Sequence, residues 1–197
     1  MAITADLVKQ LREKTGAGIM DCKKALQEND GDLNKATEWL RKKGITSAQK
    51  RVGRETKEGV IDAYIHPGSR LGVMIEVNCE TDFVAKNSEF QQFVHNMAMQ
   101  IAAANPLVVS REQLAAEVIE RELNIYREQA KATGKPAAIL EKIAQGKLEK
   151  YYQEVCLLEQ SYIREPERTV EDVLTEIRAR IGENILIKRF VRFQLGE

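Results

Sequence analysis

Apolar residues occupy every second position of the stretch that ends at residue 79. Alternation of this kind is typical of a strand with one buried side. A second apolar run, residues 60–66, precedes it across the turn-forming residues 67–70. The two runs predict a β-hairpin. The residues of the second strand that would share one face are Leu71, Val73, Ile75, Val77 and Cys79.

The first 45 residues carry three stripes of apolar residues at helical spacing, separated by breaks that contain glycine. We expect three short helices, with Asp32 capping the third by accepting a backbone N–H bond and Gly44 ending it. The stripes are Leu7, Val8 and Leu11, then Ile19, Cys22, Ala25 and Leu26, then Leu33, Ala36 and Leu40.

Residues 46–57 are polar and basic and show almost no apolar periodicity. A stretch of this kind is typical of a linker or of a solvated helical face, and it predicts a domain boundary. We therefore expect an N-terminal module over residues 1–45, a basic linker over residues 46–57 and a core domain over residues 58–197.

Helical patterns follow the hairpin, and a strand-like run completes the sheet. The stripe over residues 90–101 predicts a helix that covers the hairpin and ends before Pro106, because proline disfavours a helical conformation in the preceding residue. Thr169 is expected to cap a later helix that Gly182 ends. Residues 185–195 are rich in β-branched and aromatic residues, which predicts a third strand.

Between these elements the sequence predicts an antiparallel pair of helices. Ser110 and Gln113 have the spacing of a capping box that starts the first helix. Residues 137–158 carry the second, which Gly146 is expected to bend or interrupt, and the two helices would meet at a turn around Gly134. The predicted fold class is therefore α+β: a small three-stranded antiparallel sheet packed with helices, a helical hairpin and an N-terminal three-helix module.

The charge balance bears on the class of ligand. Of the 197 residues, 30 are Lys or Arg and 30 are Asp or Glu, so the formal net charge is zero. Because clustered cations supply most of the affinity for phosphate backbones, this balance argues against direct binding of nucleic acid. A specific protein partner fits better.

The sequence also bears on location. No apolar run approaches the roughly 20 residues that a membrane span needs, and the N-terminus lacks the pattern of a secretory signal. Cys22, Cys79 and Cys156 are odd in number and far apart, which matches neither a disulfide framework nor a zinc site. We expect a cytoplasmic protein in a reducing compartment, with no membrane partner.

The chain offers few groups for bond chemistry. The cysteines occupy positions predicted to be buried, where a thiol is usually inert, and His66 and His95 are isolated from one another. No phosphate-binding glycine loop is present, and Glu80 with Asp82 supplies too few ligands for a metal ion. We therefore predict a protein that is not an enzyme and that holds neither a metal nor a cofactor.

Phe83 is the unusual residue of the segment between the hairpin and the next helix. One interpretation is structural: Thr81 or Asp82 caps the helix and Phe83 acts as a hydrophobic staple. The other is functional: a rigid ring beside a carboxylate enters a pocket of a partner at low entropic cost. The residues alone leave both interpretations open.

Three segments of the chain resemble the elongation factor Ts family of bacteria and organelles. They are LREKTGAGIMDCKKAL at residues 11–26, EVNCETDFVAKN at residues 76–87 and IGENILIKRF at residues 181–190. Their order and spacing, with the helical patterns between them, extend the resemblance over essentially the whole chain.

The resemblance implies a guanine nucleotide exchange factor for elongation factor Tu, with an N-terminal module like a ubiquitin-associated domain. It also implies the short form of the family, for which we expect a homodimer. The source would be a bacterial cytoplasm or a plastid stroma, and the bacterial cytoplasm is favoured because no transit segment precedes Met1. One departure is Ser161, where the family usually has proline, which would loosen the local turn.

The resemblance further assigns roles to individual residues. Thr81, Asp82, Phe83 and Val84 match the family segment that disturbs the magnesium site of the GTPase, with Phe83 as the wedge and Asp82 as its polar companion. Residues 19 and 20 match the contact of the N-terminal module with the GTPase, although at the first of these positions Ile19 stands where the family often has methionine, followed by Met20.

Two other function classes remain as alternatives. A binding adapter would use residues 1–45 to hold a helical partner without any effect on nucleotide release. A weak hydrolase would use Cys79, His66 and Glu80 around the hairpin, and thiol alkylation would abolish its activity.

Overall fold

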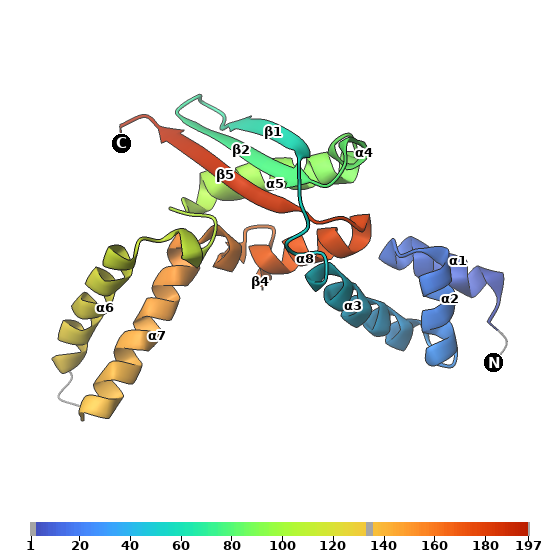
Figure 1. The fold of residues 1–197 in the computed structure, drawn as a ribbon, viewed down its shortest axis with the longest axis horizontal. Coiled ribbons are helices and arrows are strands. Elements are labelled where there is room, and N and C mark those ends of the chain that lie inside the picture. Colours follow the sequence, from blue (N-terminus) through green and yellow to red (C-terminus); the bar gives the residue numbers. More distant parts are fainter. Residues whose placement is uncertain (1–2, 133–135, 197) are drawn as a thin grey trace.

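The computed structural model describes residues 3–132 and 136–196, and the elements are arranged along one long axis (Figure 1). A small sheet with its covering helices lies in the middle, the first helices lie at one end, and a pair of long helices projects at the other. The elements are α1 Ala5–Thr15, α2 Ile19–Glu28, α3 Leu33–Gln49, β1 Glu58–Ile65, β2 Leu71–Cys79, α4 Asp82–Ala85, α5 Ser88–Ala104, η1 Arg111–Gln113, α6 Ala116–Lys131, α7 Ala137–Val155, η2 Leu157–Glu159, β3 Ser161–Tyr162, β4 Glu165–Thr169, α8 Val170–Ile181 and β5 Leu186–Gln194.

The main sheet has three antiparallel strands, as the sequence predicts, and the structure gives their order as β1-β2-β5. In the register, Val77 of β2 lies between Val60 of β1 and Ile187 of β5. The alternating residues of β2 face inward: Val73, Ile75, Val77 and Cys79 are all buried, and α5 packs on this side. The opposite side of the sheet carries exposed apolar side chains.

A second sheet of two strands, β3 and β4, was not predicted. Its strands are two and five residues long, and the sequence of β4, EPERT, has no alternation of apolar and polar residues. Ser161, the residue that departs from the family pattern, lies in β3 and pairs with Thr169.

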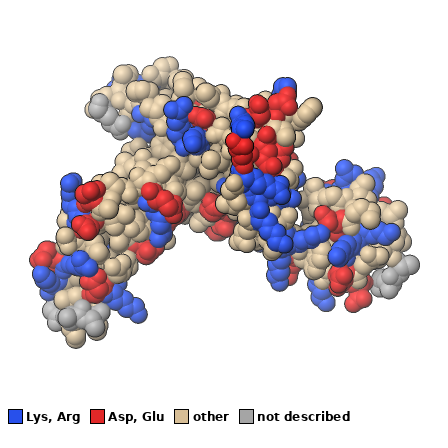
Figure 2. Space-filling model, in the orientation of Figure 1, with Lys and Arg blue, Asp and Glu red and all other residues tan. Residues whose placement is uncertain are grey.

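The third helix is longer than the sequence predicts. Instead of ending at Gly44, α3 continues to Gln49 and takes in the first residues of the expected linker. Ala48 is buried, and Gly44 lies against Ala179 of α8. Gly44 therefore does not end the helix. Because it has no side chain, it lets the backbones of α3 and α8 approach closely. Figure 2 shows the Lys and Arg side chains of this region gathered along α3 and the segment that follows it.

Two predictions about the helical hairpin are wrong. No capping box forms at Ser110, because the side chain of Gln113 instead accepts a bond from the backbone N–H of Val109 at 2.9 Å, and α6 begins only at Ala116. α7 is continuous through Gly146. The helices α6 and α7 do pack together as predicted, while the turn expected at Gly134 lies outside the described residues.

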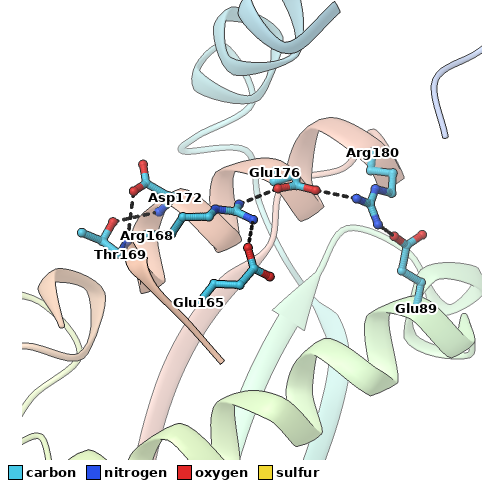
Figure 3. Close-up of polar contacts among 7 residues, drawn as sticks. All are labelled: Glu89, Glu165, Arg168, Thr169, Asp172, Glu176 and Arg180. Atoms are coloured by element: carbon cyan, nitrogen blue, oxygen red, sulfur yellow. Dashed lines mark hydrogen bonds and ion pairs between the residues drawn. The ribbon is translucent and has the colours of Figure 1, made fainter. Parts of the chain in front are cut away.

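The predicted caps around α8 are confirmed. Thr169 and Asp172 form a reciprocal capping box, and Gly182 ends the helix in the left-handed conformation. A chain of alternating acidic and basic side chains runs along α8 toward α5 (Figure 3), with contacts of 2.5–2.8 Å. Its members are Glu165, Arg168, Glu176, Arg180 and Glu89.

Within the described ranges, no helix is both long enough and apolar enough to cross a membrane.

Candidate functional site

Phe83 projects from α4, a single helical turn between β2 and α5. Thr81 caps this turn, and its Oγ1 accepts a bond from the backbone N–H of Val84 at 3.4 Å. Val84 packs against the core, whereas the side chain of Phe83 is 81 % exposed. The cap is confirmed and the staple is wrong, because the ring is largely exposed to solvent instead of being packed. The geometry is that of a ring presented to solvent.

Glu183 connects the start of this turn to the loop between α8 and β5. One carboxylate oxygen accepts backbone N–H bonds from Glu80 and Thr81 at 3.0 and 3.1 Å. The other oxygen accepts a hydrogen bond from the hydroxyl of Thr81 at 2.6 Å. Three donors of the loop that precedes Phe83 therefore converge on one side chain located about a hundred residues later in the sequence.

Asn184 adds two further connections at the same place. Its backbone N–H donates to a carboxylate oxygen of Glu80 at 2.5 Å, and its side-chain amide donates to the backbone carbonyl of Arg54 at 2.8 Å. Arg54 lies in the segment that leads from the N-terminal helices to β1, and its guanidinium is 3.6 Å from the carboxylate of Glu80. The loop that precedes Phe83 is thus tied to both neighbouring segments.

Asp82, the acidic neighbour of Phe83, is held by Lys86 one turn later, with a distance of 2.7 Å between the carboxylate and the ammonium group. The hydrogen bond from Lys86 lowers the pKa of the Asp82 carboxyl below its usual range. The pair is exposed to solvent, so Asp82 remains available to the groups of a partner.

Ile19 and Met20 lie at the first turn of α2, where Gly18 occupies the N-cap position. Their side chains are 54 % and 74 % exposed. Ile19 was also expected in the apolar stripe of its helix, and this part of the prediction is wrong, because Cys22, Ala25 and Leu26 alone form the buried face of α2. Both residues are instead available to a partner.

The two predicted contact regions lie in the same half of the molecule. α4 stands at the end of the sheet that is turned toward α1 and α2, away from the hairpin of α6 and α7 (Figure 1). The side chain of Arg180 lies beside Gly16 at the end of α1, and its guanidinium bonds to Glu89 at the start of α5. α8 therefore contacts both the N-terminal helices and the helix that follows α4.

The structure separates the residues of the hydrolase alternative. His66 follows the end of β1, where Ile65 pairs with Gly72, and Cys79 lies seven residues farther along β2. At about 3.4 Å per residue these positions are roughly 24 Å apart. Burial, with the nearby carboxylate of Glu183, raises the pKa of the Cys79 thiol to about 11, so it is not a nucleophile near neutral pH. The structure therefore does not bring together the residues that this alternative requires.

Sequence reasoning missed the roles of Glu183 and Asn184. Both lie in the segment at residues 181–190 that carries the family resemblance, so its presence was the available signal. Nothing in the local pattern indicates that these side chains reach Glu80 and Thr81, because the contacts join elements far apart in the sequence.

Comparison with known proteins gives the same family for one family model and three relatives. A family model described as "Elongation factor TS" matches residues 6–197. A protein of Desulfotalea psychrophila named "Elongation factor Ts" is 60 % identical over 196 residues, with 100 % of both chains covered. Proteins of the same name from Nitratidesulfovibrio vulgaris and Carboxydothermus hydrogenoformans are 57 % and 59 % identical, and the matches cover 98 % and 90 % of their lengths and 100 % and 99 % of this chain.

Proposed function

The chain belongs to the elongation factor Ts family, and from this premise we propose that it is a guanine nucleotide exchange factor for elongation factor Tu in the cytoplasm. The observation that carries the proposal is the exposed ring of Phe83 on a short helix whose preceding loop is held by several hydrogen bonds. An exposed aromatic ring on an ordered support is the kind of residue that dominates binding energy when it enters a partner's pocket.

An exchange factor makes and breaks no covalent bond. It binds the nucleotide-free GTPase more tightly than the nucleotide-bound form, and linkage requires that it weaken nucleotide binding by the same factor. The function therefore needs a group whose contacts are favourable only when the nucleotide site of the partner is distorted. Phe83 is this group.

In the proposed mechanism the ring of Phe83 inserts beside the phosphate-binding elements of elongation factor Tu and displaces them. The geometry by which magnesium neutralises the β-phosphate is then lost, the metal leaves, and GDP follows. Asp82 contacts backbone or side-chain groups of the partner rather than the metal, because a single carboxylate cannot complete the octahedral shell of magnesium. Thr81 and Val84 hold the turn on which both act.

The N-terminal helices supply the second contact. Residues 1–45 would act as a module of the ubiquitin-associated type that grips the nucleotide-binding domain of the partner through Ile19 and Met20. Exposed apolar side chains at the start of a helix suit a helix-to-helix contact. This contact contributes affinity, while the displacement of the magnesium site depends on Phe83.

We also propose that the protein is a homodimer formed through the open side of the sheet. Ile61, Ile65, Met74, Val191 and Phe193 are exposed on this side, one or more from each strand. Contiguous apolar surface of this kind on a soluble protein usually marks an interface. A second copy related by a two-fold axis would cover the same patch with itself.

Release of a fluorescent GDP from elongation factor Tu, followed by stopped flow, tests the exchange function. The unmodified protein should accelerate release. Phe83→Ala should lower the maximal rate at saturating protein by about 30-fold, the loss typical of a central aromatic contact. Met20→Ala should instead raise the concentration that gives half-maximal acceleration by about tenfold.

Leu107→Ala is the matched control, because Leu107 is an exposed apolar residue outside the proposed contacts, and its rates should equal those of the unmodified protein. No acceleration by the folded, unmodified protein would refute the exchange function. Binding to elongation factor Tu without any change in nucleotide release would support the adapter alternative.

A further inference from the structure

The turn that carries Phe83 cannot hold its own conformation. α4 contains only four residues, and an isolated turn of helix is unstable because its first hydrogen bonds restrict many backbone angles for little gain. The ring of Phe83 adds no packing, since it is almost fully exposed. The direction in which the ring points must therefore depend on the contacts of the neighbouring residues.

On the C-terminal side of Phe83, Val84 and Ala85 pack against the core, whereas on its N-terminal side the contacts converge on the loop between α8 and β5. Glu183 accepts three hydrogen bonds from the loop before Phe83. Two come from backbone N–H groups and one from the hydroxyl of Thr81. Because the hydroxyl donates its proton to Glu183, its oxygen is left to accept the N–H of Val84 and so to cap α4. One carboxylate thus orients the cap of the helix that bears Phe83.

The loop that supplies Glu183 is itself firmly held. Gly182 adopts the left-handed conformation and its N–H bonds to the carbonyl of Arg178 at 3.0 Å. The buried guanidinium of Arg178 donates to the carbonyl of Ile185 at 2.8 Å, which closes the loop from the other side. Glu183 therefore projects from a rigid support toward a turn that has little stability of its own.

We propose that Glu183 is a positioning residue for nucleotide exchange, which acts through Phe83 by holding the Thr81 cap and the backbone before it. This inference rests on the proposed function. A preorganised ring enters the partner without first being ordered, and a group misplaced by about 1 Å can cost two orders of magnitude in rate. Without Glu183, Phe83 is still present, but the cap and the backbone before it lose three hydrogen bonds and orient the ring less strictly.

A double-mutant cycle distinguishes positioning from a general loss of stability. Glu183→Ala should lower the maximal rate of GDP release from elongation factor Tu by about tenfold when Phe83 is present. In a Phe83→Ala background the same change should alter the rate by less than about twofold, because residues that act as a unit are not additive. Equal effects in both backgrounds would overturn the proposal.

Glu183→Gln is the conservative control. Its amide oxygen can still accept from both backbone N–H groups and its NH2 group can donate to the Thr81 oxygen, so the exchange rate should stay within about threefold of the unmodified protein. Glu128→Ala removes an exposed carboxylate that pairs with Lys131 on α6, far from α4, and should leave the rate unchanged. A loss in Glu183→Gln as large as in Glu183→Ala would count against the hydrogen-bond mechanism.

Amide hydrogen exchange gives a readout that does not depend on the partner. In Glu183→Ala the amides of Glu80, Thr81 and Val84 should exchange at least tenfold faster, while those of β2 keep their protection. Unchanged protection at these amides would refute the positioning role even if nucleotide exchange were impaired. Absence of any exchange activity in the unmodified protein would refute the proposed function instead and leave this measurement interpretable.

Discussion

Gly44 of α3 and Ala179 of α8 touch so closely that a Cβ atom added at Gly44 would lie 3.1 Å from the Cβ of Ala179. This contact joins the last helix of the N-terminal region to the helix that leads to Glu183. It explains why a glycine occupies the middle of α3, where its low helix propensity is otherwise unfavourable.

Two helical glycines should therefore respond differently to alanine. At Gly146, within α7, an added Cβ meets nothing within 4 Å, so Gly146→Ala should raise the free energy of unfolding by about 1 kcal/mol. At Gly44 the same gain in helix propensity is offset by crowding against Ala179. The free energy of unfolding of Gly44→Ala should therefore be at least about 1 kcal/mol below that of Gly146→Ala. Urea unfolding of both variants measures the difference, and equal stabilisation would contradict the close contact.

Phe83 and Phe90 should separate function from stability. Phe83 is exposed, so Phe83→Ala should change the free energy of unfolding by less than about 0.5 kcal/mol. Phe90 is fully buried in the core beneath the sheet, so Phe90→Ala should cost about 3–5 kcal/mol. Thermal and chemical unfolding of the two variants check this, and a large destabilisation by Phe83→Ala would show that the ring packs in solution.

A charge on the open side of the sheet should weaken the proposed homodimer. Met74 lies in the central strand, between Ala63 and Val191, so Met74→Glu would bury an unpaired carboxylate in the two-fold interface. If the proposal holds, sedimentation velocity should show a dimer for the unmodified protein and a monomer for Met74→Glu at the same concentration. Ile139→Glu, at an exposed apolar position of α7, is the control that should remain dimeric.

The buried thiols should make stability fall in alkali. Burial, with nearby carboxylates, raises the pKa of the Cys79 thiol from 9.0 to about 11. Burial, with the nearby carboxylate of Glu159, raises the pKa of the Cys156 thiol from 9.0 to about 11. Between pH 9 and 11 the unfolded thiols lose protons that the folded ones keep, so the unfolded state binds fewer protons and is favoured as the pH rises. The stability that the two protonated thiols contribute is fully present below pH 9 and is lost as the pH rises through 11.

The slope should reach at most about 1.4 kcal/mol per pH unit for each thiol. Urea unfolding between pH 8 and 11 measures it, and a Cys79→Ala/Cys156→Ala variant provides the matched control. The double variant should show a shallower decline than the unmodified protein. Parallel curves would mean that the thiols do not contribute.

The elements that could be predicted from the sequence are those whose stabilising groups lie close together in the chain. The alternation that ends at Cys79, the stripe of α5 that begins near Phe90, and the reciprocal cap of Thr169 and Asp172 all involve neighbours within a few residues. Such local periods and caps can be read from one segment at a time. The α+β class and the three strands of the main sheet followed from them.

The way in which distant segments meet could be learned only from the folded chain. Whether Gly44 ends a helix or admits Ala179 depends on a helix more than a hundred residues later, and whether Phe83 packs or projects depends on what surrounds it. The carboxylate of Glu183 reaches Thr81 across a similar separation. Contacts of this kind leave no local period in the sequence, because their energy comes from groups brought together only when the chain has folded.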